Sequence, residues 1–206
     1  MILERLELGP FGSNCYILGD VSKTKEAMII DPGAEAVRIL QKISDLGLTV
    51  KSIVLTHGHI DHVGALKEVK DATAAEVAIH TADAPSLIKE ASSSTVFGVT
   101  FPSPPQADRL LNEGDNLTVG DDQLKVIHTP GHTAGGICLC GNGIVFTGDT
   151  LFALSVGRSD LGGGNHQQLI SGIQEKLMLL PDSTVVYPGH GPQSTIGTER
   201  QQNPFL

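Results

Sequence analysis

The segment Thr56-His57-Gly58-His59-Ile60-Asp61-His62 decides how this chain is interpreted. It follows a predicted short buried strand and leads into a predicted helix. Alternate side chains of an extended segment point the same way, so His57 and His59 can bind one metal ion. As the chain turns into the helix, Asp61 and His62 can project towards a neighbouring position. Three imidazoles and a carboxylate so close together are a donor set that suits zinc, iron or manganese.

Three later residues have the same placement and extend this candidate site. They are His132, Asp149 and His190. Each follows a predicted strand and has a glycine beside it, and glycine permits tight turns and close approach of the backbone to a bound group. Loops that follow strands can meet at one edge of a sheet. We therefore interpret the three residues and the first motif as one set of ligands.

The composition restricts the classes of function. With 206 residues, 40% of them hydrophobic and 18% charged, the chain is expected to form a single domain over residues 1–206. The formal charge of −9 disfavours binding to nucleic acid or to an anionic membrane surface. No uninterrupted apolar stretch reaches the ~18 residues of a membrane span. An odd number of cysteines and an N-terminus without a signal-peptide pattern predict a cytoplasmic protein.

Strand-like and helix-like patterns alternate twice along the chain. Strands are expected over residues 2–8, 15–18, 27–30, 52–55, 77–80, 117–119, 124–128, 136–139, 144–147 and 184–187. Helices are expected over residues 36–46, 63–69, 84–91 and 166–180. Residues 92–107 are expected to be irregular and to form a functional loop. This order predicts two β-rich layers with helices outside them.

The ligand set, His57-x-His59-x-Asp61-His62 followed by His132, Asp149 and His190, resembles that of the metallo-β-lactamase superfamily. Within it, the chain is similar to the glyoxalase II-like (hydroxyacylglutathione hydrolase-like) group, especially its short members of the YcbL type. The stretches that support this are 13–16, 157–160, 189–192 and 203–206. The resemblance implies an α/β fold, a four-layer αββα sandwich with the metal site at one edge of the β-layers.

The resemblance also implies a role for each ligand. His57, His59 and His132 would hold a first divalent metal ion, Asp61, His62 and His190 a second, and Asp149 would bridge the two. Zinc is the expected metal, with iron or manganese as alternatives. A hydroxide bridging the metals, oriented by Asp61, would attack the acyl carbonyl of a small-molecule thioester such as hydroxyacylglutathione.

One departure and one alternative limit this expectation. The C-terminal helical domain with which larger glyoxalase II enzymes bind glutathione has no counterpart after His190, so hydrolysis is a safer expectation than glutathione specificity. The alternative is a mononuclear-iron persulfide dioxygenase, in which His57, His132 and Asp149 would hold the iron. Those enzymes tend to have alanine where this chain has Gly189, which favours the hydrolase. A β-lactamase is disfavoured because many of those enzymes have cysteine in place of Asp149.

The remaining candidates have simpler interpretations. His80 and His128 are not needed as ligands and are expected to be structural. Asp31 belongs to a predicted turn, and support of the metal ligands is the alternative. Arg158 either contacts an anion near the site or pairs with Asp160. The oligomeric state is left open.

Overall fold

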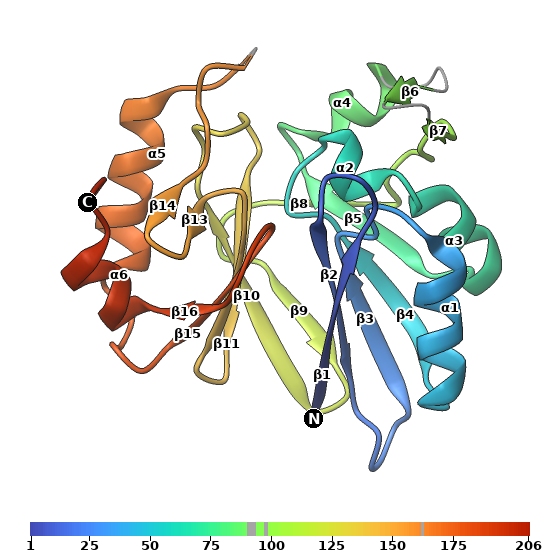
Figure 1. Cartoon of the computed structure of the whole chain (residues 1–206). Helices are drawn as coiled ribbons and strands as arrows, with labels where there is room; N and C mark the ends of the chain where they lie inside the picture. The colour runs from blue at the N-terminus through green and yellow to red at the C-terminus, as the bar shows by residue number, and fades with distance from the viewer. Residues whose placement is uncertain (90–93, 97–98, 162) are drawn as a thin grey trace.

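The computed structural model describes residues 1–89, 94–96, 99–161 and 163–206. Within these residues, two six-stranded sheets face one another at the centre of the molecule (Figure 1). Helices α1 (Ala36–Asp45) and α3 (Leu66–Thr73) cover the outer face of the first sheet, and α5 (His166–Gly172) and α6 (Ile196–Gln202) cover that of the second. The predicted αββα sandwich is therefore confirmed.

The first sheet comes from the N-terminal half and has the order β1-β2-β3-β4-β5-β8. The strands are β1 (Ile2–Leu8), β2 (Ser13–Gly19), β3 (Glu26–Ile30), β4 (Thr49–Val54), β5 (Glu76–His80) and β8 (Arg109–Leu111). The pairs β1–β2 and β2–β3 are antiparallel, whereas β3, β4, β5 and β8 run parallel. Two short helices, α2 (Ile60–Val63) and α4 (Ala84–Lys89), follow β4 and β5.

The second sheet comes from the C-terminal half and has the order β16-β15-β12-β11-β10-β9. The strands are β9 (Asn116–Val119), β10 (Asp122–His128), β11 (Ile137–Gly141), β12 (Ile144–Gly148), β15 (Val185–Pro188) and β16 (Ser194–Thr195). Among the described strand pairs of this sheet, β12 and β15 are parallel and the others are antiparallel. Two hairpins lie outside the sheets, one of β6 (Ser94–Val96) and β7 (Val99–Phe101), the other of β13 (Leu151–Phe152) and β14 (Ser155–Val156).

Three predicted segments were wrong in detail. The helix expected over 63–69 is two helices, α2 and α3, separated by Gly64 and Ala65. The helix expected over 166–180 is α5 continued by one π-helical turn, Ile173–Leu177. Residues 92–107 are not irregular throughout, because they contain β6 and β7. The part of this prediction that concerns residues 92–93 and 97–98 lies outside the described residues. Strands this short carry too little alternation to be recognised in the sequence.

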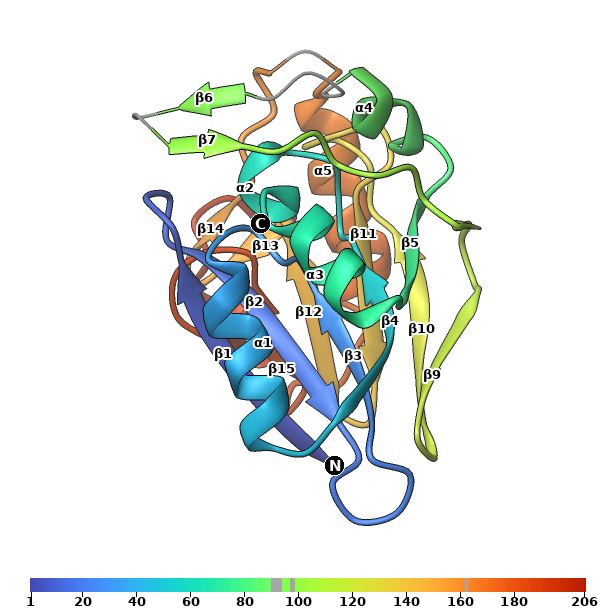
Figure 2. The same ribbon diagram turned by 90° about the vertical axis from the view of Figure 1, so that its right-hand side faces the viewer.

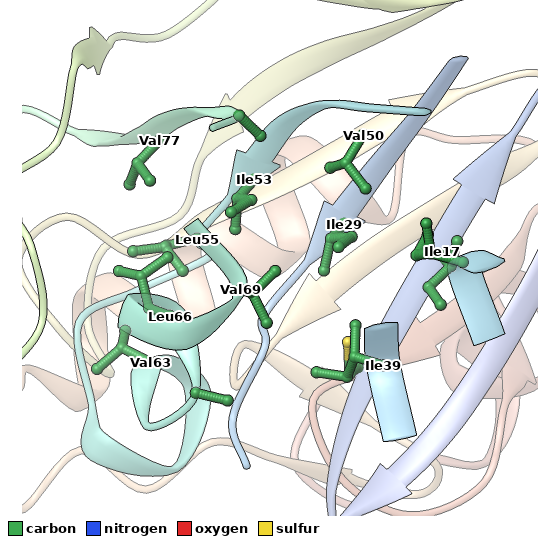
Figure 3. Packing of buried hydrophobic residues seen from close by; sticks show 14 of the residues in the cluster. Ile17, Ile29, Ile39, Val50, Ile53, Leu55, Val63, Leu66, Val69 and Val77 are labelled. Atoms are coloured by element: carbon green, nitrogen blue, oxygen red, sulfur yellow. The ribbon is translucent and has the colours of Figure 1, made fainter. Parts of the chain in front are cut away.

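Alternate side chains of the central strands fill two different cores. In β2, β3 and β4, Ile17, Ile29 and Ile53 point to the helices and pack with Ile39 of α1 and Val69 of α3 (Figure 3). Their neighbours on the other face of the sheet pack against the second sheet. A third cluster lies between the second sheet and α5. Burial of each large aliphatic side chain stabilises the folded chain by roughly 1.5–3 kcal/mol. The packed strands therefore hold in place the loops at their ends, which bear the candidate ligands.

The loops that bear the predicted ligands all leave the same edge of the sandwich. The edge lies next to α2 and α4 at the top of both views (Figures 1 and 2). Loops that follow β3, β4 and β5 approach it from the first sheet, and loops that follow β10, β12 and β15 approach it from the second. Ligands of open α/β sheets commonly bind at the carboxyl ends of parallel strands. Separately, no helix among the described residues is long and apolar enough to cross a membrane.

Candidate metal centre

The structure brings all seven predicted ligands together at this edge. Among the described residues, three groups of three have their ligand atoms within 4.8 Å of one another: His57, His59 and His132; Asp61, His62 and His190; and Asp31, His57 and His62. The first two groups match the predicted ligand sets, and the third takes one histidine from each and adds Asp31. Asp149 lies between the first two groups. One carboxylate oxygen, Oδ1, is 3.3 Å from His62 Nε2, and the other, Oδ2, is 3.6 Å from His132 Nε2.

The first group is a triangle of imidazole rings in edge-to-face contact. Ring centroids are 4.7 Å apart for His57 and His59, 4.8 Å for His57 and His132, and 4.6 Å for His59 and His132. His132 Nε2 and His59 Nδ1 face each other at 2.9 Å. His57 is only 1% exposed, so this group forms the deeper side of the site.

The second group is more open to solvent. His190 Nε2 lies 3.0 Å from Asp61 Oδ2 and 3.3 Å from His62 Nε2. The His62 side chain is fully buried, but those of Asp61 and His190 are 17% and 28% exposed. Asp61 and His190, together with the half-buried His59 of the first group, are thus ligands that an incoming molecule can reach.

Neighbouring oxygens fix the orientation of two of these histidine rings. His62 Nδ1 donates to Asp31 Oδ2 at 2.9 Å, and His132 Nδ1 donates to the carbonyl oxygen of Arg158 at 2.7 Å. The Asp31 carboxylate also accepts from the amide and the hydroxyl of Thr56, at 2.7 and 2.6 Å. Such contacts on one ring nitrogen leave the other free to bind a metal. Asp31 therefore takes the supporting role that the sequence left as an alternative to a turn.

The two most buried histidines of the site differ in their electrostatics. Burial lowers the pKa of His62, but the carboxylates of Asp149 and Asp31 outweigh burial and raise this pKa well above its usual value. Burial, together with the nearby histidines, lowers the pKa of His57 well below its usual value. Burial raises the pKa of Asp61, but its hydrogen bond with His190 and the charge of His62 outweigh it and bring the pKa to about 2. A neutral imidazole and an ionised carboxylate are the forms that bind metal ions.

The residues present fit divalent metal ions. Ligands about 2.0–2.1 Å from a tetrahedral zinc ion are about 3.3 Å apart, close to the separations of His62 Nε2 from His190 Nε2 and from Asp149 Oδ1, both 3.3 Å. Among the described residues, His57 Nε2 and Asp149 Oδ1 are buried without a hydrogen-bond partner. Buried polar atoms without partners are rare and call for an explanation, and a bound cation provides one.

The other residues discussed from sequence lie outside the two groups. His80 and His128 stack on each other with centroids 4.0 Å apart and belong to neither group. Arg158 forms the ion pair with Asp160, at 2.8 and 2.9 Å. Sequence reasoning missed Phe152, whose ring centroid is 6.2 Å from that of His190. A single aromatic residue gives no signal of such a contact.

Comparison with known proteins identifies the family. The model of the Metallo-beta-lactamase superfamily matches residues 8–190. The chain belongs to this superfamily. The matched region contains both groups of candidate ligands, and members of this superfamily include metallo-hydrolases.

Other members of the superfamily are similar over the complete chain. The hydroxyacylglutathione hydrolase GloC of Haemophilus influenzae is 37% identical over 100% of this chain and 98% of its own. Among solved structures, the BLEG-1 B3 metallo-beta-lactamase is 37% identical with a TM-score of 0.89, covering 100% of this chain and 99% of its own.

Two further solved structures are also similar to this chain. ETHE1 from Myxococcus xanthus is 32% identical with a TM-score of 0.83, covering 99% of this chain and 84% of its own. TTHA1623 in a di-iron-bound form is 35% identical with a TM-score of 0.85, covering 98% of this chain and 100% of its own.

Proposed function

We propose that this protein is a metal-dependent hydrolase of small thioesters, with hydroxyacylglutathione as the first candidate substrate. The observation that carries the proposal is the presence of two adjacent ligand groups with Asp149 between them. The similarity to GloC, a hydroxyacylglutathione hydrolase, over the complete chain supports the same activity.

The proposed metal ligands are those of the two groups. His57, His59 and His132 hold the first ion, Asp61, His62 and His190 the second, and Asp149 both. Zinc is the first candidate, because imidazole and carboxylate ligands suit it, and iron and manganese are alternatives that accept the same donors. The di-iron form of TTHA1623 makes iron the stronger of the two alternatives.

Divalent cations bound here supply a water of lowered pKa and polarise the oxygen of a carbonyl group. The ionised carboxylate of Asp61, at the open side of the site, can accept a hydrogen bond from the attacking water and orient it towards the acyl carbon. Cleavage of a thioester releases a thiolate, which leaves without a strong general acid. The chain therefore needs no further proton donor at the leaving sulfur.

The first test is metal content combined with thioester hydrolysis. Protein purified without chelator is expected to contain about two metal ions per chain and to hydrolyse S-lactoylglutathione, followed by the loss of thioester absorbance. His62→Ala should lose one of the two ions and most of the activity. His80→Ala, which alters a histidine outside both groups, is the matched control and should retain both. Two ions without thioester hydrolysis would refute the proposed substrate class, and cleavage of a β-lactam instead would place the activity with that of BLEG-1.

The second candidate is a persulfide dioxygenase with a single iron. The similarity to ETHE1, a dioxygenase, favours it. His57, His132 and Asp149 would then hold the iron. Gly189 argues against this candidate, because persulfide dioxygenases tend to have alanine at this position. In this structure an added Cβ at Gly189 would lie 2.8 Å from His62 Cε1 and closer still to Asp149 Oδ1, so alanine does not fit here without a shift. About one iron per chain and oxygen consumption with a persulfide would establish this activity in place of hydrolysis.

We propose a small molecule as the partner of this protein. The net charge of −9 disfavours nucleic acid and a membrane as partners. We also propose the cytoplasm as the location, because Cys15, Cys138 and Cys140 are free thiols, and reducing compartments keep thiols in that state.

A further inference from the structure

A buried carboxylate outside the ligand set joins the two loops of the three-histidine group. Asp83, 5% exposed, lies just before α4. Its Oδ2 accepts from the amide of Gly58 at 3.2 Å and from the hydroxyl of Thr133 at 2.7 Å. Its Oδ1 accepts from the amide of Gly135 at 2.6 Å.

Through these partners, Asp83 sets the distance between the loop that bears His57 and His59 and the loop that bears His132. Gly58 separates His57 from His59, and Thr133 directly follows His132. The loop after β4 belongs to the first sheet and the loop after β10 to the second, so one carboxylate fixes a distance across the sandwich. A Cβ at Gly135 would lie 2.5 Å from the Asp83 nitrogen, which shows how closely the two segments approach.

A second buried side chain holds the loop of His190 in the same way. Asn14 of β2 is fully buried. Its side-chain amide donates to the carbonyl oxygens of Pro188 and Gly191, both at 2.9 Å, and its backbone amide donates to Gly189 at 2.7 Å. His190 is therefore held on both sides by one residue of the opposite sheet.

The orientation of the Asn14 amide favours this role over a general packing role. Both of its side-chain partners are carbonyl oxygens, which require the NH2 group to face them. Its own oxygen Oδ1 is buried without a partner among the described residues, and an unpaired buried acceptor destabilises a fold. The residue thus carries a stability cost while it fixes the His190 loop.

We propose that Asp83 and Asn14 are positioning residues, each of which aligns one of the two ligand groups across the sandwich. Asp83 aligns the three-histidine group and Asn14 aligns His190 in the other group. Because Asp83 contacts residues beside His57, His59 and His132, whereas Asn14 contacts residues beside His190, each substitution weakens one metal position more than the other. This inference rests on the proposed metal centre, and it adds residues that bind neither metal nor substrate.

The experiment is a cobalt(II) titration followed by absorption spectroscopy. His132→Ala and His190→Ala provide the spectra of proteins in which one ligand of either group is missing. Asp83→Asn should bind one of its two cobalt ions at least tenfold more weakly than the unaltered protein does. After addition of one equivalent of cobalt, its absorption spectrum should match that of His132→Ala. Asn14→Ala should weaken the other equivalent to a similar extent and give the spectrum of His190→Ala. Asp83→Glu, which keeps the carboxylate, should restore part of the lost affinity.

Matched controls separate positioning from general destabilisation. Asp20 is 6% exposed and accepts from the amides of Ser22, Lys23 and Thr24 at the other end of β2, so Asp20→Asn should bind both equivalents like the unaltered protein. Asn203, also 6% exposed, donates to Ser155 and Glu199, and Asn203→Ala should behave likewise. The inference would be overturned if Asp83→Asn or Asn14→Ala weakened the binding of both cobalt ions equally. It would also be overturned if the control variants weakened cobalt binding as much as these two variants do.

Hydrogen exchange of the metal-free proteins tests the same contacts without any metal. Asp83→Asn should raise exchange in peptides covering residues 57–59 and 133–135, and Asn14→Ala in a peptide covering residues 189–191. Unchanged exchange in these peptides would refute the anchoring role. If the unaltered protein bound no metal, the proposed function would fail, and the exchange measurement would still decide whether the two residues hold these loops.

Discussion

At the scale of the residue, the orientation of the candidate ligands depends on buried polar groups that hydrogen-bond to them. Asp31 illustrates this, because one carboxylate accepts three hydrogen bonds, two from Thr56 and one from His62. It links the start of the ligand-bearing loop to one of the ligands. Contacts of this kind set both the direction of the ring and the basicity of its free nitrogen.

Asp31→Asn should therefore weaken metal binding although Asp31 lies outside the proposed ligand set. The substituted amide nitrogen cannot accept from Thr56 or His62, so we expect metal affinity to fall about 10–100-fold and the metal-free protein to lose about 1–3 kcal/mol of unfolding free energy. Competition with a chromophoric chelator and urea denaturation measure the two effects. Asp45→Asn, at an exposed position of α1, should change neither. Unaltered affinity in Asp31→Asn would contradict the supporting role.

The thiols offer a second prediction at this scale. Burial raises the pKa of Cys138 to about 12 and that of Cys15 still further, whereas Cys140 is half-buried and its pKa is raised less. Because the thiolate is the reactive form, a maleimide at pH 7.5 should label Cys140 first and leave the other two unlabelled in the native protein. Mass spectrometry should find one label in the native protein, none in Cys140→Ser, and three after denaturation. Rapid labelling of Cys15 or Cys138 would contradict the described burial.

At the scale of the element, each ligand is presented by a loop whose shape depends on a close backbone approach. The loop after β15 is the clearest case, because Gly189 passes directly beside Asp149 and His62. Its amide donates to the carbonyl oxygen of Gly148 at 2.7 Å. The loops after β12 and β15 are therefore joined by backbone contacts as well as by their ligands.

Gly189→Ala should disturb the second metal position more than the first. The new methyl group would meet Asp149 and His62 at less than van der Waals distance, so metal content should fall from about two ions per chain towards one. Elemental analysis measures this directly. Gly172→Ala is the control, because a Cβ there would be 3.7 Å from Thr129 Cα, an ordinary contact. Two tightly bound ions in Gly189→Ala would show that the loop can move aside and that Gly189 is not required.

The sequence predicts the elements near the site better than the connections around them. The ligand residues were recognisable because they are dense, chemically distinctive and placed after strands. The positioning role of Asp83 and Asn14 could not be recognised, although residues 13–16 support the family resemblance, since their partners lie up to 52 and 177 residues away. The π-helical turn after α5 was also missed, because Leu169, Ile173 and Leu177 recur at a spacing that an ordinary helix also permits.

At the scale of the whole molecule, the candidate centre joins the two halves of the sandwich. His57, His59, Asp61 and His62 come from the first half, whereas His132, Asp149 and His190 come from the second. A ligand bound only by the folded protein stabilises it in proportion to the logarithm of its concentration over its Kd. Metal bound here should therefore hold the two sheets together.

Removal of metal should accordingly lower the melting temperature. At a free metal concentration one hundred times Kd, one bound ion contributes about 2.7 kcal/mol, which corresponds to a shift of roughly 5–10 °C for a chain of this size. Differential scanning calorimetry with chelator, followed by addition of zinc, measures the loss and its recovery. His62→Ala should show a smaller shift than the unaltered protein. A melting temperature that ignores chelator and zinc would contradict binding at a centre shared by both sheets.

The separation of the ligands along the chain has a consequence for protein synthesis. A growing polypeptide leaves the ribosome from its N-terminus, so the motif at residues 57–62 emerges long before His190. Until the loop after β15 has followed and docked on Asn14, the nascent chain presents unshared imidazoles that can capture whatever metal is near. The complete set of seven proposed ligands therefore assembles only after His190 has been synthesised.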